Sequence, residues 1–210
     1  MSNTNLTAYK KLYESISYTA DYRFNTYRRL LNLEGASNIA LILASTALIV
    51  VSLTTALYNN NLGRNEIYIN IGQNCLPIIM LALSILVSGA KYGTRAEKIH
   101  DCAQTLNSLK KLLKYDIDDE GFSPSRDNFV NYATQYSEII SRYENHSKID
   151  LLVEKLKEIK CLTEFRILSE VIANLVGKGI LYYFYLFISI MSVGWMIVGI
   201  YLAIKGATFC

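Results

Sequence analysis

The chain has 210 residues, which suits one domain with room for an appendage. It is 51% apolar and 19% charged, whereas an ordinary soluble domain is about 45–50% apolar and about 25% charged. A net charge of +3 is too small to argue for nucleic-acid binding, and four cysteines without a CxxC pair exclude a disulfide framework or a zinc ribbon.

Residues 1–35 predict an N-terminal helix. Apolar and aromatic residues recur there at steps of three, four and seven, and form a single helical stripe interrupted by Arg23. The members of the stripe are Tyr9, Tyr13, Ile16, Ala20, Tyr27 and Leu30. The segment is polar and mixed in charge, so we expect no cleavable signal peptide in it.

Three long runs without charge follow at residues 36–57, 67–90 and 179–204. About 20 apolar residues are enough to cross the hydrocarbon core of a bilayer. The first two runs predict a transmembrane hairpin over residues 36–90, and a small-residue stripe in the first run, Ala36, Ala40 and Ala44, predicts close helix contact. The third predicts a C-terminal transmembrane helix, with a re-entrant or surface-bound segment as the alternatives.

The distribution of Lys and Arg predicts the orientation. Five such residues precede the first run, the loop between the first two runs has only Arg64, and six follow between Lys91 and Lys114. Because cytoplasmic loops carry the excess of Lys and Arg, we expect the N-terminus and residues 91–178 in the cytoplasm. The expected location is a cell membrane, with several passes; the bacterial inner membrane is what the family resemblance below implies.

Residues 91–178 predict a cytoplasmic helical region. Tyr92, Ile99, Leu106 and Leu113 repeat every seven residues, so we expect the second span to continue unbroken into a helix that ends near Tyr115. Ser123-Pro124 predicts the start of the next helix, with an apolar stripe from Phe129 to Tyr143. Ser147 and Asp150 predict another start. The expected fold class is therefore an all-α integral membrane protein.

The second span has one polar face. At about 100° per residue, its amides and hydroxyls all fall on one side of the helix, together with Pro77. We consider two interpretations: the lining of a water-filled pore built from several copies, and a hydrogen-bonded seam between helices. The pore-lining candidates are Asn70, Gln73, Asn74, Ser84 and Ser88. No charged side chain lies within a span, which disfavours an ion-coupled transporter.

The two histidines suggest contact or signal positions. His100 lies in the predicted helix after the second span, and His146 lies in the stretch RYENHSKID with Asn145 and Asp150. Their spacing with Cys102 fits no known metal site, so we expect no metal. The Asn145-His146-Ser147 sequon faces the cytoplasm in this topology. No catalytic or nucleotide-binding motif is present, and we expect neither enzyme activity nor a cofactor.

Three stretches carry a family resemblance: YRFNTYRRL before the first span, KYGTRAEKIHDCAQTLNSLKKLL after the second, and YENHSKID downstream. Together with the hairpin they resemble the SLATT effectors (SMODS- and SLOG-associating two-transmembrane domains), in particular the subfamily often encoded beside reverse transcriptases. The third run departs from the two-span plan. The resemblance implies an anti-phage effector that a reverse transcriptase or a nucleotide-second-messenger system activates.

These observations lead to two hypotheses. The first is a homo-oligomeric effector that forms a pore or disrupts the inner membrane, which would cause abortive infection. The second is a non-conducting membrane anchor or scaffold that recruits a cytosolic enzyme. The expected partners are the lipid bilayer, further copies of the chain and the activating system, without direct nucleic-acid binding.

Overall fold

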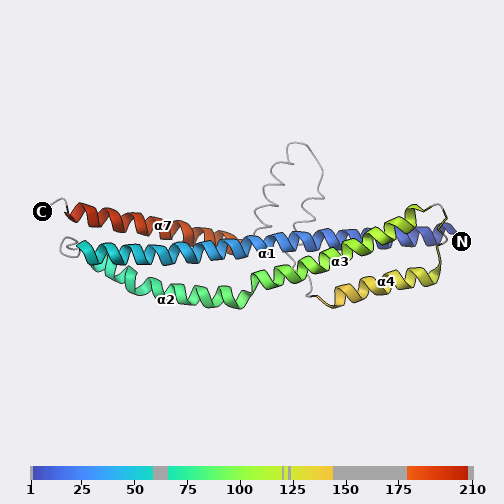
Figure 1. The fold of residues 1–210 in the computed structure, drawn as a ribbon, viewed down its shortest axis with the longest axis horizontal. Helices are drawn as coiled ribbons and strands as arrows, with labels where there is room; N and C mark the ends of the chain where they lie inside the picture. Colours follow the sequence, from blue (N-terminus) through green and yellow to red (C-terminus); the bar gives the residue numbers. More distant parts are fainter. Residues whose placement is uncertain (1, 59–65, 120, 123, 144–178, 208–210) are drawn as a thin grey trace, which may run out of the picture. The chain divides into compact units, whose positions relative to one another are not determined.

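The computed structural model describes residues 2–58, 66–119, 121–122, 124–143 and 179–207 (Figure 1). Among these residues it contains helices and no strand, which confirms the all-α prediction. The helices are α1 (Ser2–Tyr58), α2 (Glu66–Ala90), α3 (Tyr92–Asp118), α4 (Arg126–Ser141) and α7 (Ile180–Ala207).

The chain divides into two compact units. One, which we call the polar unit, comprises residues 1–31 and 93–177, and the other, the membrane unit, comprises residues 32–92 and 178–210. Helix α1 contributes its N-terminal part to the polar unit and its C-terminal part to the membrane unit. In Figure 1, α1 is coloured from dark blue at its N-terminal end to cyan at its C-terminal end.

Within the described residues, three helical stretches are long and apolar enough to cross a membrane, and they include the three runs predicted from the sequence. They lie within Leu6–Leu57, Ile69–Asp118 and Ile180–Leu202. The first two stretches are far longer than the roughly 20 residues that a bilayer requires, so only their apolar parts can lie in hydrocarbon. The chain is therefore a membrane protein with three apolar helices.

A seven-residue repeat runs along α1. Every seventh side chain is almost completely buried, and the series includes Arg23, which is only 2% exposed. The interpretation of Arg23 as an interruption of the stripe was wrong: the side chain continues it. Charge misled the sequence analysis because Arg is rarely buried completely. The repeat consists of Tyr9, Ile16, Arg23, Leu30, Ser37, Ala44 and Val51.

The core of the polar unit joins α1, α3 and α4. Tyr9, Ile16 and Ala20 of α1 pack against α3 residues that include Leu106 and Leu113, both fully buried. Helix α4 covers this cluster with the apolar stripe predicted for residues 129–143, and its aromatic side chains are half-buried there. The predicted stripes therefore form one helical core.

The predicted start of α4 needs a small correction. The helix begins at Arg126, and Ser125 caps it: its hydroxyl accepts a hydrogen bond from the backbone N–H of Asn128 at 3.2 Å. Pro124 lies just before this cap and is not the first helical residue. A serine oxygen satisfies one of the free N–H groups of the first turn, and this makes Ser125 the stronger start signal.

The prediction of one unbroken helix from the second span to Tyr115 was wrong. Helix α2 ends at Ala90 and α3 begins at Tyr92, with Lys91 between them at a φ of +48°. A residue other than glycine is disfavoured in this left-handed region, so a lysine gives no reason to expect it. Hydropathy and periodicity report side chains and not backbone conformation, and they gave no sign of the break. Helix α3 then continues three residues beyond the predicted end, to Asp118.

Small residues allow the three helices of the membrane unit to approach closely. Ala40 and Ala44 of the predicted small-residue stripe are buried, as is Val51, which packs against Gly199 of α7. A Cβ atom at Gly199 would lie 2.8 Å from a methyl carbon of Val51. Large aliphatic side chains such as Ile42 and Ile49 point outward, as expected for a surface that faces lipid.

Candidate functional site

The polar face of α2 lies on the outside of the membrane unit. Asn70, Asn74, Ser84 and Ser88 are all exposed, and the side-chain amide of Asn74 donates to the backbone oxygen of Asn70 at 2.9 Å. Gln73 differs, because it is half-buried and donates to the hydroxyl of Thr55 on α1 at 3.0 Å. Gln73 thus belongs to a seam within the chain, whereas the others face outward.

The outward residues follow a coiled-coil spacing. Positions 70, 77 and 84 form one row and positions 74, 81 and 88 another, and all six are exposed. Repeats of three and four residues are the pattern by which helices of neighbouring subunits pack. Pro77 has no N–H, so it cannot make the helical hydrogen bond to the backbone carbonyl oxygen of Gln73. That oxygen is a further polar group on this face.

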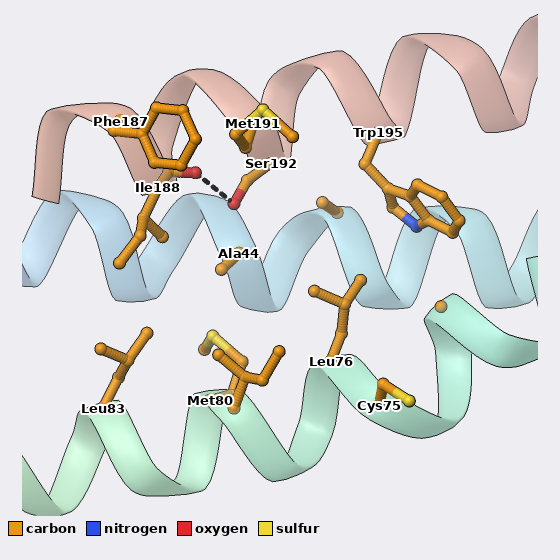
Figure 2. Close-up of a pocket in the computed structure, with 13 residues that line it drawn as sticks. Ala44, Cys75, Leu76, Met80, Leu83, Phe187, Ile188, Met191, Ser192 and Trp195 are labelled. Carbon is orange, nitrogen blue, oxygen red and sulfur yellow. Dashed lines mark hydrogen bonds between the residues drawn. The ribbon is translucent and has the colours of Figure 1, made fainter. Parts of the chain in front are cut away.

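The opposite face of α2 borders a groove that the sequence analysis did not find. Helices α1, α2 and α7 enclose it, with a cavity volume of about 320 Å³ (Figure 2). At about 100° per residue, the α2 positions that line it centre roughly 150° from the polar face. The alanine stripe of the first span was the one sequence signal for it. The groove lining includes Ala44, Gly72, Cys75, Met80, Met191 and Trp195.

His100, a predicted contact residue, lies among aromatic side chains in the polar unit. Its ring stacks on Tyr27 with centroids 4.5 Å apart and meets the edge of Phe24 at 5.9 Å. Its Nε2 lies 2.8 Å from Nε2 of Gln104, while its Nδ1 is buried without a hydrogen-bond partner among the described residues. His100 is thus positioned by packing against α1 and is half-exposed.

Tyrosine hydroxyls fasten α4 to α3. Tyr143 donates to a carboxylate oxygen of Asp101 at 2.7 Å, and Tyr132 donates to one of Asp116 at 2.6 Å. The hydrogen bond to Asp101 raises the pKa of Tyr143 to about 12, and burial raises that of Tyr132 to about 12, assisted by its bond to Asp116. Both phenols therefore stay protonated donors at neutral pH.

The remaining predicted contact residues lie outside the described part of the chain. Asn145, His146 and Asp150 follow Tyr143, the last residue described before the gap at 144–178. Within the described residues, no group of three or more His, Cys, Asp or Glu side chains could hold a metal ion. His100 and Cys102 are therefore placed only as members of the helical core and its edge.

A comparison with protein families identifies the chain. The family model described as SMODS and SLOG-associating 2TM effector domain family 5 matches residues 5–202. The chain belongs to this SLATT family. The match includes most of α7, so the third apolar helix lies within the region that the family shares. No curated protein and no solved structure matches the chain.

Membership in the SLATT family implies a membrane effector in defence systems. The three apolar helices agree with that location. The exposed surfaces of the membrane unit are therefore the first places to look for a functional element. In this SLATT protein those surfaces are the polar face of α2 and the groove behind it.

Proposed function

We propose that this SLATT protein is a pore-forming effector of a bacterial anti-phage defence system, in which several copies assemble with the polar faces of α2 toward a common axis. Ion flow through the assembly would depolarise the inner membrane and stop growth of the infected cell. The protein needs no catalytic residue or cofactor for this action, because the lesion itself is the effect.

The exposed amides of α2 are the observation that carries the proposal. Asn70 and Asn74 lie on the outside of a helix whose apolar part must sit in a bilayer. Placing an amide in hydrocarbon without a hydrogen-bond partner costs about 4–8 kcal/mol on cyclohexane scales, and the bond from Asn74 to the backbone oxygen of Asn70 uses only one of the polar groups that the two amides carry. Association of copies through this face relieves the cost, either by hydrogen bonds between helices or by contact with water in a pore.

The length of the polar row favours a pore over a local seam. Positions 70 and 88 are 18 residues apart, which corresponds to about 27 Å along a helix, close to the roughly 30 Å thickness of the hydrocarbon core. A row that crosses nearly the whole core can line a continuous aqueous path. Four of its six positions carry an amide or a hydroxyl side chain, and the other two are Pro77 and Leu81.

The polar unit is the proposed receiver of the activating signal. The excess of Lys and Arg favours a cytoplasmic position for it, where a reverse transcriptase or a nucleotide-second-messenger system could reach it. Helix α1 belongs to both units as one helix, so a change in the packing of its first part has a direct covalent path into the membrane.

The test measures membrane potential in bacteria that express the full chain with its activating partner. A voltage-sensitive dye reports depolarisation, and the key variant carries Asn70→Leu and Asn74→Leu together. We expect that variant to insert into the membrane in normal amounts and to cause little depolarisation, because the water-facing amides are replaced by aliphatic groups.

A matched control separates this effect from a general loss of amides. Asn38 is also exposed and belongs to the first apolar run, so Asn38→Leu should depolarise the membrane like the wild type. Depolarisation that persists in the double variant contradicts the pore proposal. A wild-type protein that causes no depolarisation but still binds its partner would favour the alternative, a non-conducting scaffold.

A further inference from the structure

We infer that the groove between α1, α2 and α7 binds one acyl chain of a bilayer phospholipid. The inference concerns the face of α2 opposite the polar row and depends only on the membrane location of the chain. Lipid binding would occur in a pore and in a scaffold alike. If the pore proposal fails, the lipid inference still stands, and if lipid binding fails, the pore proposal still stands.

The lining of the groove selects an apolar occupant. Figure 2 shows Leu76, Met80 and Leu83 of α2 across from Ile188 and Met191 of α7, with Ala44 of α1 between them. Aliphatic and thioether side chains offer dispersion contacts and no strong hydrogen-bonding group. A flexible hydrocarbon chain is the ligand that such a lining suits.

Water is a poor occupant of most of this space. The hydroxyl of Ser192 already donates to the backbone oxygen of Ile188 at 2.8 Å (Figure 2). The indole N–H of Trp195, at one end of the groove, is buried without a hydrogen-bond partner among the described residues. A buried water needs about 2–4 polar partners, and one indole N–H does not supply them. An empty groove would also cost the dispersion contacts of its walls. Hydrocarbon from the surrounding bilayer fills it without either cost.

The shape of the groove suits a flexible hydrocarbon chain. Gly72 and Leu83 mark the two ends of the lining on α2, and 11 residues correspond to about 16 Å of helix. Side chains of three helices line this length, and the cavity volume is about 320 Å³. An acyl chain can adapt to such a long space by rotation about its single bonds.

The direction of the groove also matches a lipid chain. Trp195 and Cys75 lie toward one end and Leu83 and Phe187 toward the other, so the long axis follows the helices (Figure 2). Helices that cross a bilayer run roughly along its normal, as acyl chains do. A lipid from the adjacent leaflet can thus enter lengthwise, and it would act as a wedge between α2 and α7.

The first experiment counts lipid bound to the full chain. The protein is extracted from membranes in mild detergent, and native mass spectrometry measures retained phospholipid per chain. We expect one retained phospholipid in the wild type and its loss in Ala44→Phe, whose ring would occupy the groove. Ala82 is exposed on α2 and does not line the groove, so Ala82→Phe should retain the lipid.

A chemical variant protects the test against misfolding. Cys75 is exposed and lines the groove, so alkylation of the folded wild type with N-ethylmaleimide adds bulk there after folding. The modified protein should lose its lipid, whereas Cys75→Ser protein treated in the same way should keep it. In the treated Cys75→Ser protein, N-ethylmaleimide still modifies any other reactive thiol, so a difference between the two proteins is due to modification of Cys75.

Two results would overturn the inference. One is a wild type that retains no phospholipid, with Cys75 residues of neighbouring copies forming an efficient disulfide cross-link, which would assign the groove to a second copy. The other is equal lipid retention in all variants and after alkylation, which would place the bound lipid elsewhere on the protein.

Discussion

The helices inside the polar unit and the helices inside the membrane unit are joined by different kinds of contact. In the polar unit, hydroxyl groups bridge between helices: Tyr9 donates to the backbone oxygen of Ser125, and Tyr132 and Tyr143 donate to carboxylates of α3. In the membrane unit, most serine and threonine hydroxyls bond the backbone of their own helix, as Ser45 and Thr46 do. Its helices meet chiefly through small residues and shape, and the bond from Gln73 to Thr55 links two of them.

This difference follows from the solvent of each unit. Lipid is as apolar as a leucine side chain, so helices in a bilayer associate through close packing and a few hydrogen bonds. In water, burial of apolar area drives association, and directional bonds to charged groups then fix which helices meet. We therefore expect the membrane unit to be most sensitive to added volume, and the polar unit to loss of a hydroxyl.

The largest effect is expected from Gly72→Ala in the membrane unit. An added Cβ would overlap the ring of Trp195 on α7, and overpacking of this kind typically costs about 1–3 kcal/mol. We expect a lower thermal midpoint in detergent micelles, measured by circular dichroism. Gly89→Ala is the matched control, because a Cβ there meets nothing within 4 Å.

A double variant sharpens this test. If the overlap with Trp195 is the cause, the cost of Gly72→Ala should shrink when Trp195→Leu is already present, since contacting residues are not additive. An unchanged cost in that background would mean that helix α2 itself, and not its contact with α7, responds to the substitution. That result would contradict the claim that close packing between helices makes the membrane unit sensitive to added volume.

A smaller effect is expected from Tyr143→Phe in the polar unit. The variant removes one hydrogen bond to the carboxylate of Asp101. Tyr143 is partly exposed, so we expect the free energy of unfolding to fall by about 1 kcal/mol. The pKa of Tyr143 is raised to about 12 from an ordinary value of 10.0. The bond's contribution is therefore fully present below pH 10 and is lost as pH rises through 12.

The measurement is the unfolding midpoint of the full chain at several pH values. The difference between wild type and Tyr143→Phe should be constant at neutral pH and should vanish at strongly alkaline pH. Tyr115→Phe provides the control, because that ring is 75% exposed. A difference that stays the same at alkaline pH would show that ring packing, not the hydroxyl, holds this end of α4.

Much of the fold could be predicted because hydropathy and periodicity report which residues avoid water. The three apolar runs, the seven-residue repeat from Tyr92 to Leu113 and the stripe on α4 all lie where the sequence analysis expected them. The resemblance to the SLATT family was likewise confirmed by the match over residues 5–202.

The missed features depend on contacts between segments far apart in the chain. Burial of Arg23 requires neighbours that periodicity does not name, and the break at Lys91 is a backbone conformation that its side chain gives no reason to expect. The groove arises only when α7 lies against α1 and α2. Apart from the alanine stripe, its lining residues are ordinary apolar residues of transmembrane helices, so hydropathy and periodicity do not distinguish them.

The most direct test of the central claim asks whether the polar face of α2 meets water in the active assembly. Purified protein without Cys75, carrying Ser84→Cys, is activated in a planar bilayer, and a charged, membrane-impermeant thiol reagent is added. We expect a current that the reagent blocks, and no block in the matched Leu86→Cys protein, whose exposed side chain lies about 160° from the polar row. Equal insensitivity of both proteins, or the absence of any current, would contradict it.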